Sequence, residues 1–181
     1  DLAVNAETTA LIAACDRQAA DPDDPQRPEG LAGVFFEDID VTGAVIACEK
    51  ANIAAPDNPR LAFQLGRAHA AAGNHAKAEP YFAAAGAAGY SAASYQLGRA
   101  LLDEAALGED WAAAIVHFRR AAEAGHPGAM FELGWSYLKG FGQAADAEMA
   151  LRWYVEAAEA GHAPSHYELG WIYFEGLAGE Q

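Results

Sequence analysis

The chain has few positive charges. Of its 181 residues, 11 are Lys or Arg and 26 are Asp or Glu, which gives a formal net charge of −15 with neutral His. Nucleic-acid binding and docking on an anionic membrane surface both require a basic patch, so this charge argues against both partners. Long apolar runs are also missing, because no window approaches the roughly 18 consecutive apolar residues of a membrane-spanning helix. We therefore expect neither nucleic-acid binding nor membrane insertion.

Recognisable catalytic and cofactor-binding motifs are missing as well. The chain lacks a Gly-x-Ser-x-Gly elbow, a phosphate-binding Gly-Lys-Ser/Thr segment and a dinucleotide fingerprint. His162 and His166 lie one helical turn apart with Glu168 nearby, but a zinc site needs three or four convergent ligands. The acidic run over residues 21–24 lacks the glycine of a calcium-binding loop. We expect no cofactor, no metal site and no enzymatic activity within these residues.

The residues that are abundant form a repeat. Alanine, the strongest helix former, makes up about a quarter of the chain, and proline is scarce after Asn58, so we expect an all-α fold. A Leu-Gly pair recurs at steps of 32, 36 and 36 residues, and a further glycine recurs every 36 residues. The leucines are Leu65, Leu97, Leu133 and Leu169, and the further glycines are Gly89, Gly125 and Gly161.

Each repeat contains two amphipathic helices, because small and aromatic residues recur at the i, i+4, i+7 spacing of one helical face. In the second helix of each pair this face consists of Ala78, Phe82 and Ala85, then Ala114, Phe118 and Ala121, then Ala150, Tyr154 and Ala157. The glycine after each repeat leucine lies inside a helix, where it costs about 0.5–1 kcal/mol relative to alanine. We predict that an aromatic ring of a neighbouring helix approaches closely there.

The first sixty residues follow this pattern only loosely. Residues 5–20 and about 41–55 are expected to be helices, with Asp40 as the N-cap of the second helix, and the Asp- and Pro-rich residues 21–30 form a loop between them. We interpret residues 1–59 as a degenerate capping helix pair with a long acidic loop. Residues 60–181 are then an array of about three repeats plus a final unpaired helix, expected at about residues 164–175.

The repeat resembles the Sel1-like repeats, which are relatives of the tetratricopeptide repeats. The best match runs over residues 133–142 (Leu-Gly-Trp-Ser-Tyr-Leu-Lys-Gly-Phe-Gly) and continues through Asp146, Ala150, Trp153, Tyr154, Ala157, Ala158 and Gly161. The resemblance covers about residues 60–181. It implies a right-handed α/α superhelix of antiparallel helix pairs and a non-catalytic scaffold or adaptor in protein–protein interaction. The alternative is an interaction module of a larger protein whose catalytic domain lies outside these residues.

The two cysteines, Cys15 and Cys48, fall in the two helices of the predicted cap. Antiparallel packing would bring them together, and the resemblance supports a disulfide because some secreted Sel1-like proteins join paired helices in this way. The alternative is two buried free thiols that pack as small hydrophobic side chains. A disulfide would indicate a periplasmic or secreted protein, and free thiols a cytoplasmic one. The start at Asp1 rather than Met fits either a removed leader or a cloning choice.

The partner-binding surface is expected on the first helix of each pair, which lines the concave face of such solenoids. Two columns flank the buried stripe there: the residue before each repeat leucine and the residue two positions after it. We call their eight members the candidate strip: Gln64, Arg67, Gln96, Arg99, Glu132, Trp135, Glu168 and Trp171. Trp and Arg are the commonest interface anchors, so we expect a protein or peptide partner. The alternative is that the Trp rings only pack over neighbouring helices.

The last helix carries an apolar face that includes Leu169, Ile172 and Tyr173. With no following helix to cover it, this face predicts either a longer array or self-association.

Overall fold

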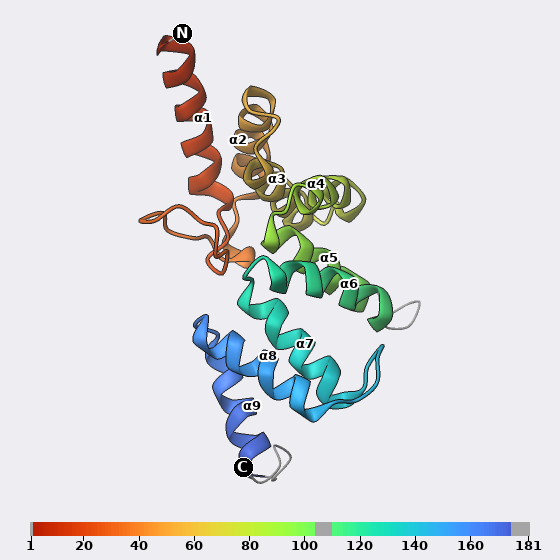
Figure 1. The fold of residues 1–181 in the computed structure, drawn as a ribbon. Helices are drawn as coiled ribbons and strands as arrows, with labels where there is room; N and C mark the ends of the chain where they lie inside the picture. The colour runs from red at the N-terminus through yellow and green to blue at the C-terminus, as the bar shows by residue number, and fades with distance from the viewer. Residues whose placement is uncertain (1, 104–109, 175–181) are drawn as a thin grey trace. The chain divides into compact units, whose positions relative to one another are not determined.

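The computed structural model describes residues 2–103 and 110–174, and every regular element in these two ranges is a helix (Figure 1). In chain order the elements are α1 (Leu2–Ala19), the 3-10 helix η1 (Phe36–Asp38), α2 (Val41–Ala54), α3 (Pro59–Ala71), α4 (His75–Ala87), α5 (Ser91–Asp103), α6 (Trp111–Glu123), α7 (Pro127–Lys139), α8 (Ala147–Glu159) and α9 (Ala163–Phe174). The predicted all-α fold class is confirmed.

Side-chain caps set several of the helix beginnings. Asn58 precedes α3, its side chain accepts a hydrogen bond from the backbone N–H of Arg60, and a proline occupies the first turn. Asp110 and Asp146 cap α6 and α8 in the same way. Asp40 does precede α2 as predicted, but its side chain makes no capping hydrogen bond.

Glycines set the ends of three helices. Gly89, Gly125 and Gly161 follow α4, α6 and α8 with φ angles of 85°, 84° and 90°. This left-handed conformation is strained for any residue with a Cβ atom, so glycine is the residue that stops the helix here at low cost. The glycines that recur every 36 residues are therefore helix stops.

The chain divides into two compact units, residues 1–93 and residues 94–181. In the first unit α1 packs on α2 and α3, α2 packs on α3, and α3 pairs with α4. In the second unit α6 packs on α7, α7 pairs with α8, and α8 packs on α9. The predicted division into a cap over residues 1–59 and an array over residues 60–181 concerns repeat architecture, and it stays a prediction.

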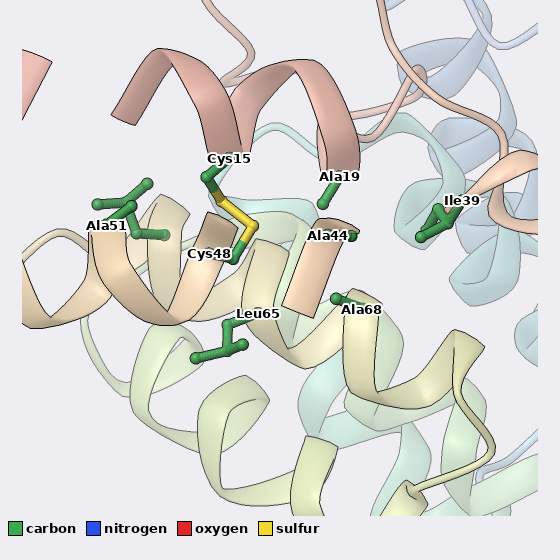
Figure 2. Packing of buried hydrophobic residues seen from close by; sticks show 9 residues of the cluster. Cys15, Ala19, Ile39, Ala44, Cys48, Ala51, Leu65 and Ala68 are labelled. Atoms are coloured by element: carbon green, nitrogen blue, oxygen red, sulfur yellow. A yellow bond between two sulfur atoms is a disulfide. The ribbon is translucent and has the colours of Figure 1, made fainter. Parts of the chain in front are cut away.

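A disulfide bond joins Cys15 of α1 to Cys48 of α2 in the core of the first unit (Figure 2). Both cysteines are fully buried, and Ala44, Leu65 and Ala68 lie in the same apolar cluster. The structure therefore has the bridge that the resemblance implied, and the two cysteines are not free thiols. The bridge ties the two N-terminal helices together across 33 residues of chain.

Aromatic rings lie directly against the helix glycines, as predicted. A Cβ atom built on Gly66 would lie 2.7 Å from the ring of Phe82, and one on Gly98 would lie 2.6 Å from the ring of Phe118. At Gly134 the corresponding distance to the ring of Tyr154 is 2.9 Å. Glycine is required at these positions because any larger residue would push the two helices of the pair apart.

Among the described residues, no helix is both long enough and apolar enough to cross a membrane.

The glycine contacts predict opposite effects for the same substitution in two helices. Gly134→Ala should lower the free energy of unfolding by about 1–3 kcal/mol, because the added methyl group overlaps the Tyr154 ring. Gly170→Ala, in α9, should raise it by about 0.5–1 kcal/mol, because nothing lies within 4 Å of the new Cβ and alanine favours the helix. Urea unfolding of both variants checks this, and equal effects would contradict the packing role of Gly134.

Candidate partner-binding site

The candidate strip is divided between the two units. Gln64 and Arg67 lie on α3 in the first unit, and the other six residues lie on α5, α7 and α9 in the second. Gln64 is 2% exposed and Arg67 is 3% exposed. The expectation that these two residues present an exposed binding surface is therefore wrong.

The N-terminal segment of the same chain covers these two side chains. Arg67 donates hydrogen bonds from Nη1 to the carbonyl oxygen of Ala19 (2.8 Å) and from Nη2 to that of Val34 (3.0 Å). Its Nε lies 3.4 Å from a carboxylate oxygen of Asp21. We define residues 20–35 as the N-terminal loop. The guanidinium of Arg67 thus contacts the chain at both ends of this loop.

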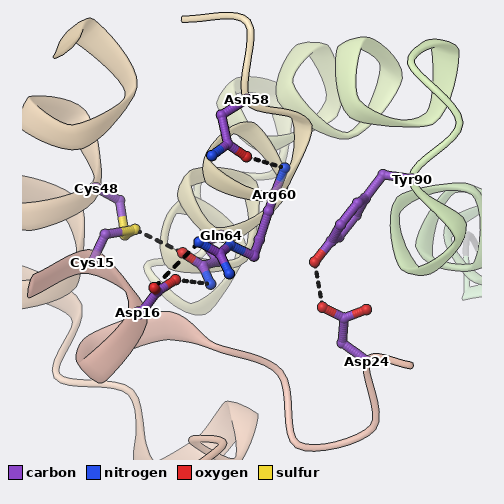
Figure 3. Close-up of polar contacts among 8 residues, drawn as sticks. All are labelled: Cys15, Asp16, Asp24, Cys48, Asn58, Arg60, Gln64 and Tyr90. Carbon is purple, nitrogen blue, oxygen red and sulfur yellow. Dashed lines mark hydrogen bonds and ion pairs between the residues drawn. A yellow bond between two sulfur atoms is a disulfide. The ribbon is translucent and has the colours of Figure 1, made fainter. Parts of the chain in front are cut away.

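Gln64 contacts the end of α1 (Figure 3). Its Nε2 donates a 2.9 Å hydrogen bond to Asp16, whose other carboxylate oxygen lies 3.4 Å from Nη2 of Arg60. The Oε1 of Gln64 lies 3.0 Å from Sγ of Cys15. This is a contact without a hydrogen bond, since a disulfide sulfur carries no proton. Both members of the strip in the first unit are therefore occupied by residues 15–34.

The middle of the N-terminal loop docks on the beginning of α5. The hydroxyl of Tyr90 donates a hydrogen bond to the carboxylate of Asp24, which is 7% exposed (Figure 3). Oε1 of Gln26 accepts hydrogen bonds from the backbone N–H (2.9 Å) and the hydroxyl (3.1 Å) of Ser91. The acidic loop is therefore held by defined polar contacts instead of lying free in solvent.

Burial shifts the pKa values of Asp24 and Arg67, which take part in these loop contacts. It raises the pKa of Asp24 above its ordinary value, and the hydrogen bond from Tyr90 opposes the rise by stabilising the carboxylate. Burial also lowers the pKa of Arg67, and the carboxylates of Asp21, Asp23 and Asp24 oppose that fall. The acidic loop thus supplies the counter-charge that a buried guanidinium requires.

In the second unit the structure brings two strip residues together around a cation. Nζ of Lys139, at the end of α7, lies 4.8 Å from the ring centroid of Trp135 and 5.6 Å from that of Trp171. Both distances are within the roughly 6 Å range of cation–π attraction. Trp135 is half-buried and Trp171 is 38% exposed, so both rings remain partly open to solvent.

Two strip carboxylates, those of Glu132 and Glu168, act on the buried hydroxyl of Tyr154 in α8. Tyr154 is fully buried, and its hydroxyl has no hydrogen-bond partner. Burial raises its pKa, and the charges of Glu168 and Glu132 raise it further. Each glutamate lies three residues before a tryptophan of its own helix, Trp171 or Trp135, so it shares a helical face with that ring. We call this group the α7–α9 site: Glu132, Trp135, Lys139, Tyr154, Glu168 and Trp171.

The remaining strip residues, Gln96 and Arg99, lie on α5 in the second unit. Gln96 is half-buried, and Arg99 is exposed. The guanidinium of Arg99 lies 6.0 Å from the ring centroid of Tyr95 and donates a 3.2 Å hydrogen bond to its hydroxyl. This pair presents a positive charge on α5, unlike the acidic pairs on α7 and α9.

A hollow of about 380 Å³ lies in the first unit among α2, α3 and α4. Its lining residues are Glu49, His69, Ala76, Lys77, Pro80 and Tyr81. The ring of His69 stacks on that of Tyr81 with centroids 5.7 Å apart. Across residues 2–103 and 110–174, no group of three or more His, Cys, Asp or Glu side chains could hold a metal ion.

Sequence reasoning missed Lys139, the hydroxyl of Tyr154 and the docking of the N-terminal loop. Two signals were present. Lys139 lies four residues after Trp135, a spacing that puts both on one helical face, and Tyr154 occupies a column in which the other repeats have phenylalanine. The loop contacts carry no comparable signal, because they join residues 33 to 66 positions apart.

The geometry is that of an all-helical repeat protein. The Sel1 repeat family matches residues 91–126, 127–162 and 163–181, which together make up half of the chain. The chain therefore belongs to the Sel1 repeat family, whose members generally mediate protein–protein interaction as scaffolds. The match begins at residue 91, whereas the resemblance was expected from about residue 60. No curated protein matches the chain.

Two solved structures share the fold. A Sel1 repeat protein from Oxalobacter formigenes has a TM-score of 0.66 and 24% identity, over 72% of this chain and 56% of that chain. The antigen c5321, a protective antigen of uropathogenic Escherichia coli strains that displays an SLR fold, has a TM-score of 0.69 and 22% identity, over 95% of this chain and 34% of that chain. The chain thus spans only about half and a third of the lengths of these two proteins.

The buried Asp24–Tyr90 contact predicts a pH-dependent loss of stability. Because the folded-state pKa of Asp24 is raised, this carboxyl favours the folded state when protonated, and that contribution is lost as the pH rises through the raised pKa. Tyr90→Phe removes the donor that stabilises the charged form. We expect the free energy of unfolding to fall by about 1–3 kcal/mol at pH 7 and by less at pH 4.

Urea unfolding at the two pH values measures this difference. Tyr167→Phe is the matched control, because Tyr167 is 75% exposed and should lose no stability at either pH. An equal deficit for Tyr90→Phe at pH 4 and pH 7 would show that the hydroxyl does not support a buried carboxylate.

Proposed function

We propose that this chain is a non-catalytic scaffold of an exported compartment, and that it binds a protein or peptide partner through the α7–α9 site, with Gln96 and Arg99 on α5 extending the surface. One observation carries the proposal. In the first repeat, the same two columns of residues already bind a polypeptide, which is the chain's own N-terminal segment.

The mode of that internal contact supports peptide recognition. Arg67 donates hydrogen bonds to two backbone carbonyl groups, those of Ala19 and Val34. Any polypeptide has such groups regardless of its sequence. Gln64 adds one side-chain contact, to Asp16. A column position that can bind main-chain oxygens in one repeat is a reasonable place for an external chain to bind in the next repeats.

The equivalent positions of the later repeats are at least partly exposed. Trp135 and Trp171 replace Arg67, and both rings remain partly accessible. Tryptophan supplies a large contact area at low conformational cost and is the residue type most enriched among binding hot spots. We infer that these two rings supply most of the affinity and that the flanking charges select the partner.

Two further parts of the chain have proposed roles. Residues 1–59 serve as a cap that covers the first repeat, because the N-terminal loop occupies the strip positions of α3. The apolar face predicted for α9 is largely covered, because Ile172 is 0% exposed and Leu169 packs against the cluster of Ala150, Tyr154 and Ile172. The surface proposed for self-association is therefore formed by Tyr167, Tyr173 and Phe174, at 75%, 61% and 86% exposure.

A second candidate is an interaction module within a larger protein, whose catalytic domain lies outside these residues. Its support is that the similar solved chains are longer, since this chain covers 56% of one and 34% of the other. The full reading frame distinguishes the two candidates.

The tryptophan pair gives the direct test of partner binding. Trp135→Ala and Trp171→Ala should each weaken the native partner by about 2 kcal/mol or more, the usual cost of removing a hot-spot ring. Proteins captured from native extract on the immobilised wild type, and lost from both variants, identify the partner, and calorimetry with that partner then measures the affinity.

Val116→Ala is the matched control, since Val116 is an apolar residue of the same unit that is 67% exposed and lies outside the α7–α9 site. Thermal unfolding should show that all three variants keep their fold. If folded Trp135→Ala and Trp171→Ala variants bind the partner as tightly as Val116→Ala does, the proposed site is wrong.

The disulfide gives the test of export. In protein taken from its native source, Cys15 and Cys48 should resist alkylation until a reductant is added, because disulfides persist in oxidising compartments. Mass spectrometry before and after reduction measures this. Cys15→Ala combined with Cys48→Ala should cost about 2–4 kcal/mol of unfolding free energy. Complete alkylation of both thiols without reductant would argue for the cytoplasm.

A further inference from the structure

We infer that the α7–α9 site takes a lysine or arginine side chain of the partner polypeptide, which displaces Lys139 from its position between the rings of Trp135 and Trp171. The inference rests on the proposed function, because it names the chemistry of the partner that the same site binds.

The first support is that the site already holds a cation. The ammonium of Lys139 lies within 5.6 Å of both ring centroids, although this lysine is an exposed residue on a flexible stem at the end of α7. The faces of the two rings carry the negative part of the aromatic quadrupole, so they attract a positive group. An exposed internal lysine is easily replaced by a cation that brings further contacts with it.

The second support is the charge around the rings. Glu132 and Glu168 each lie three residues before a tryptophan of the site and so share a helical face with its ring, and both carboxylates raise the pKa of Tyr154. A partner carboxylate would be repelled by them, and a partner ammonium or guanidinium would be attracted. The net charge of −15 also attracts a basic segment and repels an acidic one.

The third support is the unpartnered hydroxyl. Tyr154 has 0% exposure, yet its oxygen has no hydrogen-bond partner, whereas buried polar groups normally have one. Its lone pairs are an unused hydrogen-bond acceptor, which an ammonium or guanidinium N–H reaches when the side chains that cover the hydroxyl move aside. Phe82 and Phe118 occupy the equivalent positions of the earlier repeats, so only this repeat places an acceptor there.

The first unit shows the same columns with the opposite charge preference. There the column residue is Arg67, and the segment that it holds carries Asp21, Asp23 and Asp24. In the α7–α9 site the neighbouring column changes from glutamine to glutamate and arginine is replaced by tryptophan. In the first unit a cationic residue of these columns binds an acidic segment. In the α7–α9 site the columns are acidic and aromatic, so the ligand that complements them is basic.

The test uses the whole chain and three capped peptides of equal length, built from glycine and serine, that contain three lysines, three glutamates or three glutamines. Tryptophan fluorescence and the indole N–H resonances report binding at fixed ionic strength. We expect the lysine peptide to bind at least about tenfold more tightly than the glutamate peptide, and to shift the resonances of Trp135 and Trp171.

Two pairs of variants separate the site from general charge attraction. Glu132→Gln with Glu168→Gln should weaken the lysine peptide about tenfold, and Glu123→Gln with Glu156→Gln, which removes the same charge from exposed positions of α6 and α8, should have little effect. Lys139→Ala should strengthen binding of the lysine peptide about two- to fivefold, which is the value of one exposed cation–π contact. Lys50→Ala in α2 removes the same charge from another exposed position and should leave binding unchanged.

The outcomes are distinct. Lack of lysine-peptide binding, equal binding of all three peptides, or equal effects of the two glutamate pairs overturns the inference. If the native partner nevertheless loses affinity on Trp135→Ala, the proposed function stands without a cationic ligand. If the partner is insensitive to Trp135→Ala, the proposed function fails as well, whatever the peptides do.

Discussion

The structure depends on the contact between an aromatic ring and a helix glycine. In three helix pairs the ring of Phe82, Phe118 or Tyr154 lies so close to the facing helix that even a methyl group would not fit. This contact sets the separation of the paired helices, and the surrounding alanines let the two backbones stay close along their length. Each of these pairs places its own ring against its own glycine, and this happens both after the 32-residue step and after the 36-residue step of the repeat.

The same contact connects packing with recognition. The ring that lies on Gly134 belongs to a tyrosine, so it ends in a buried hydroxyl near Glu132 and Glu168. A packing position of the repeat therefore also contributes a polar atom to the proposed binding site. In the earlier repeats the position is phenylalanine, and the columns beside it are either occupied by the N-terminal segment, as at Arg67, or carry a positive charge, as at Arg99.

Most of the fold could be predicted because it is local. Helix starts at Asn58, Asp110 and Asp146, and left-handed stops at the repeat glycines, are set by residues within one turn of each end. The ring-on-glycine contacts could be predicted because the repeat places both partners in fixed columns. Asp40 shows the limit of this reasoning, since its position as a cap was right but its side chain makes no capping bond.

The candidate site was less accessible, because exposure depends on residues far along the chain. By itself the sequence determined the helical class, the repeat register, the family and the eight positions that face away from the buried stripe. Only the tertiary structure decided which of those positions are open. It buried Gln64 and Arg67 under residues 15–34, joined Cys15 to Cys48, and placed Lys139 between Trp135 and Trp171. Periodicity gives the direction of a side chain from its own helix, but what covers that side chain is set by packing of distant segments, which no local pattern encodes.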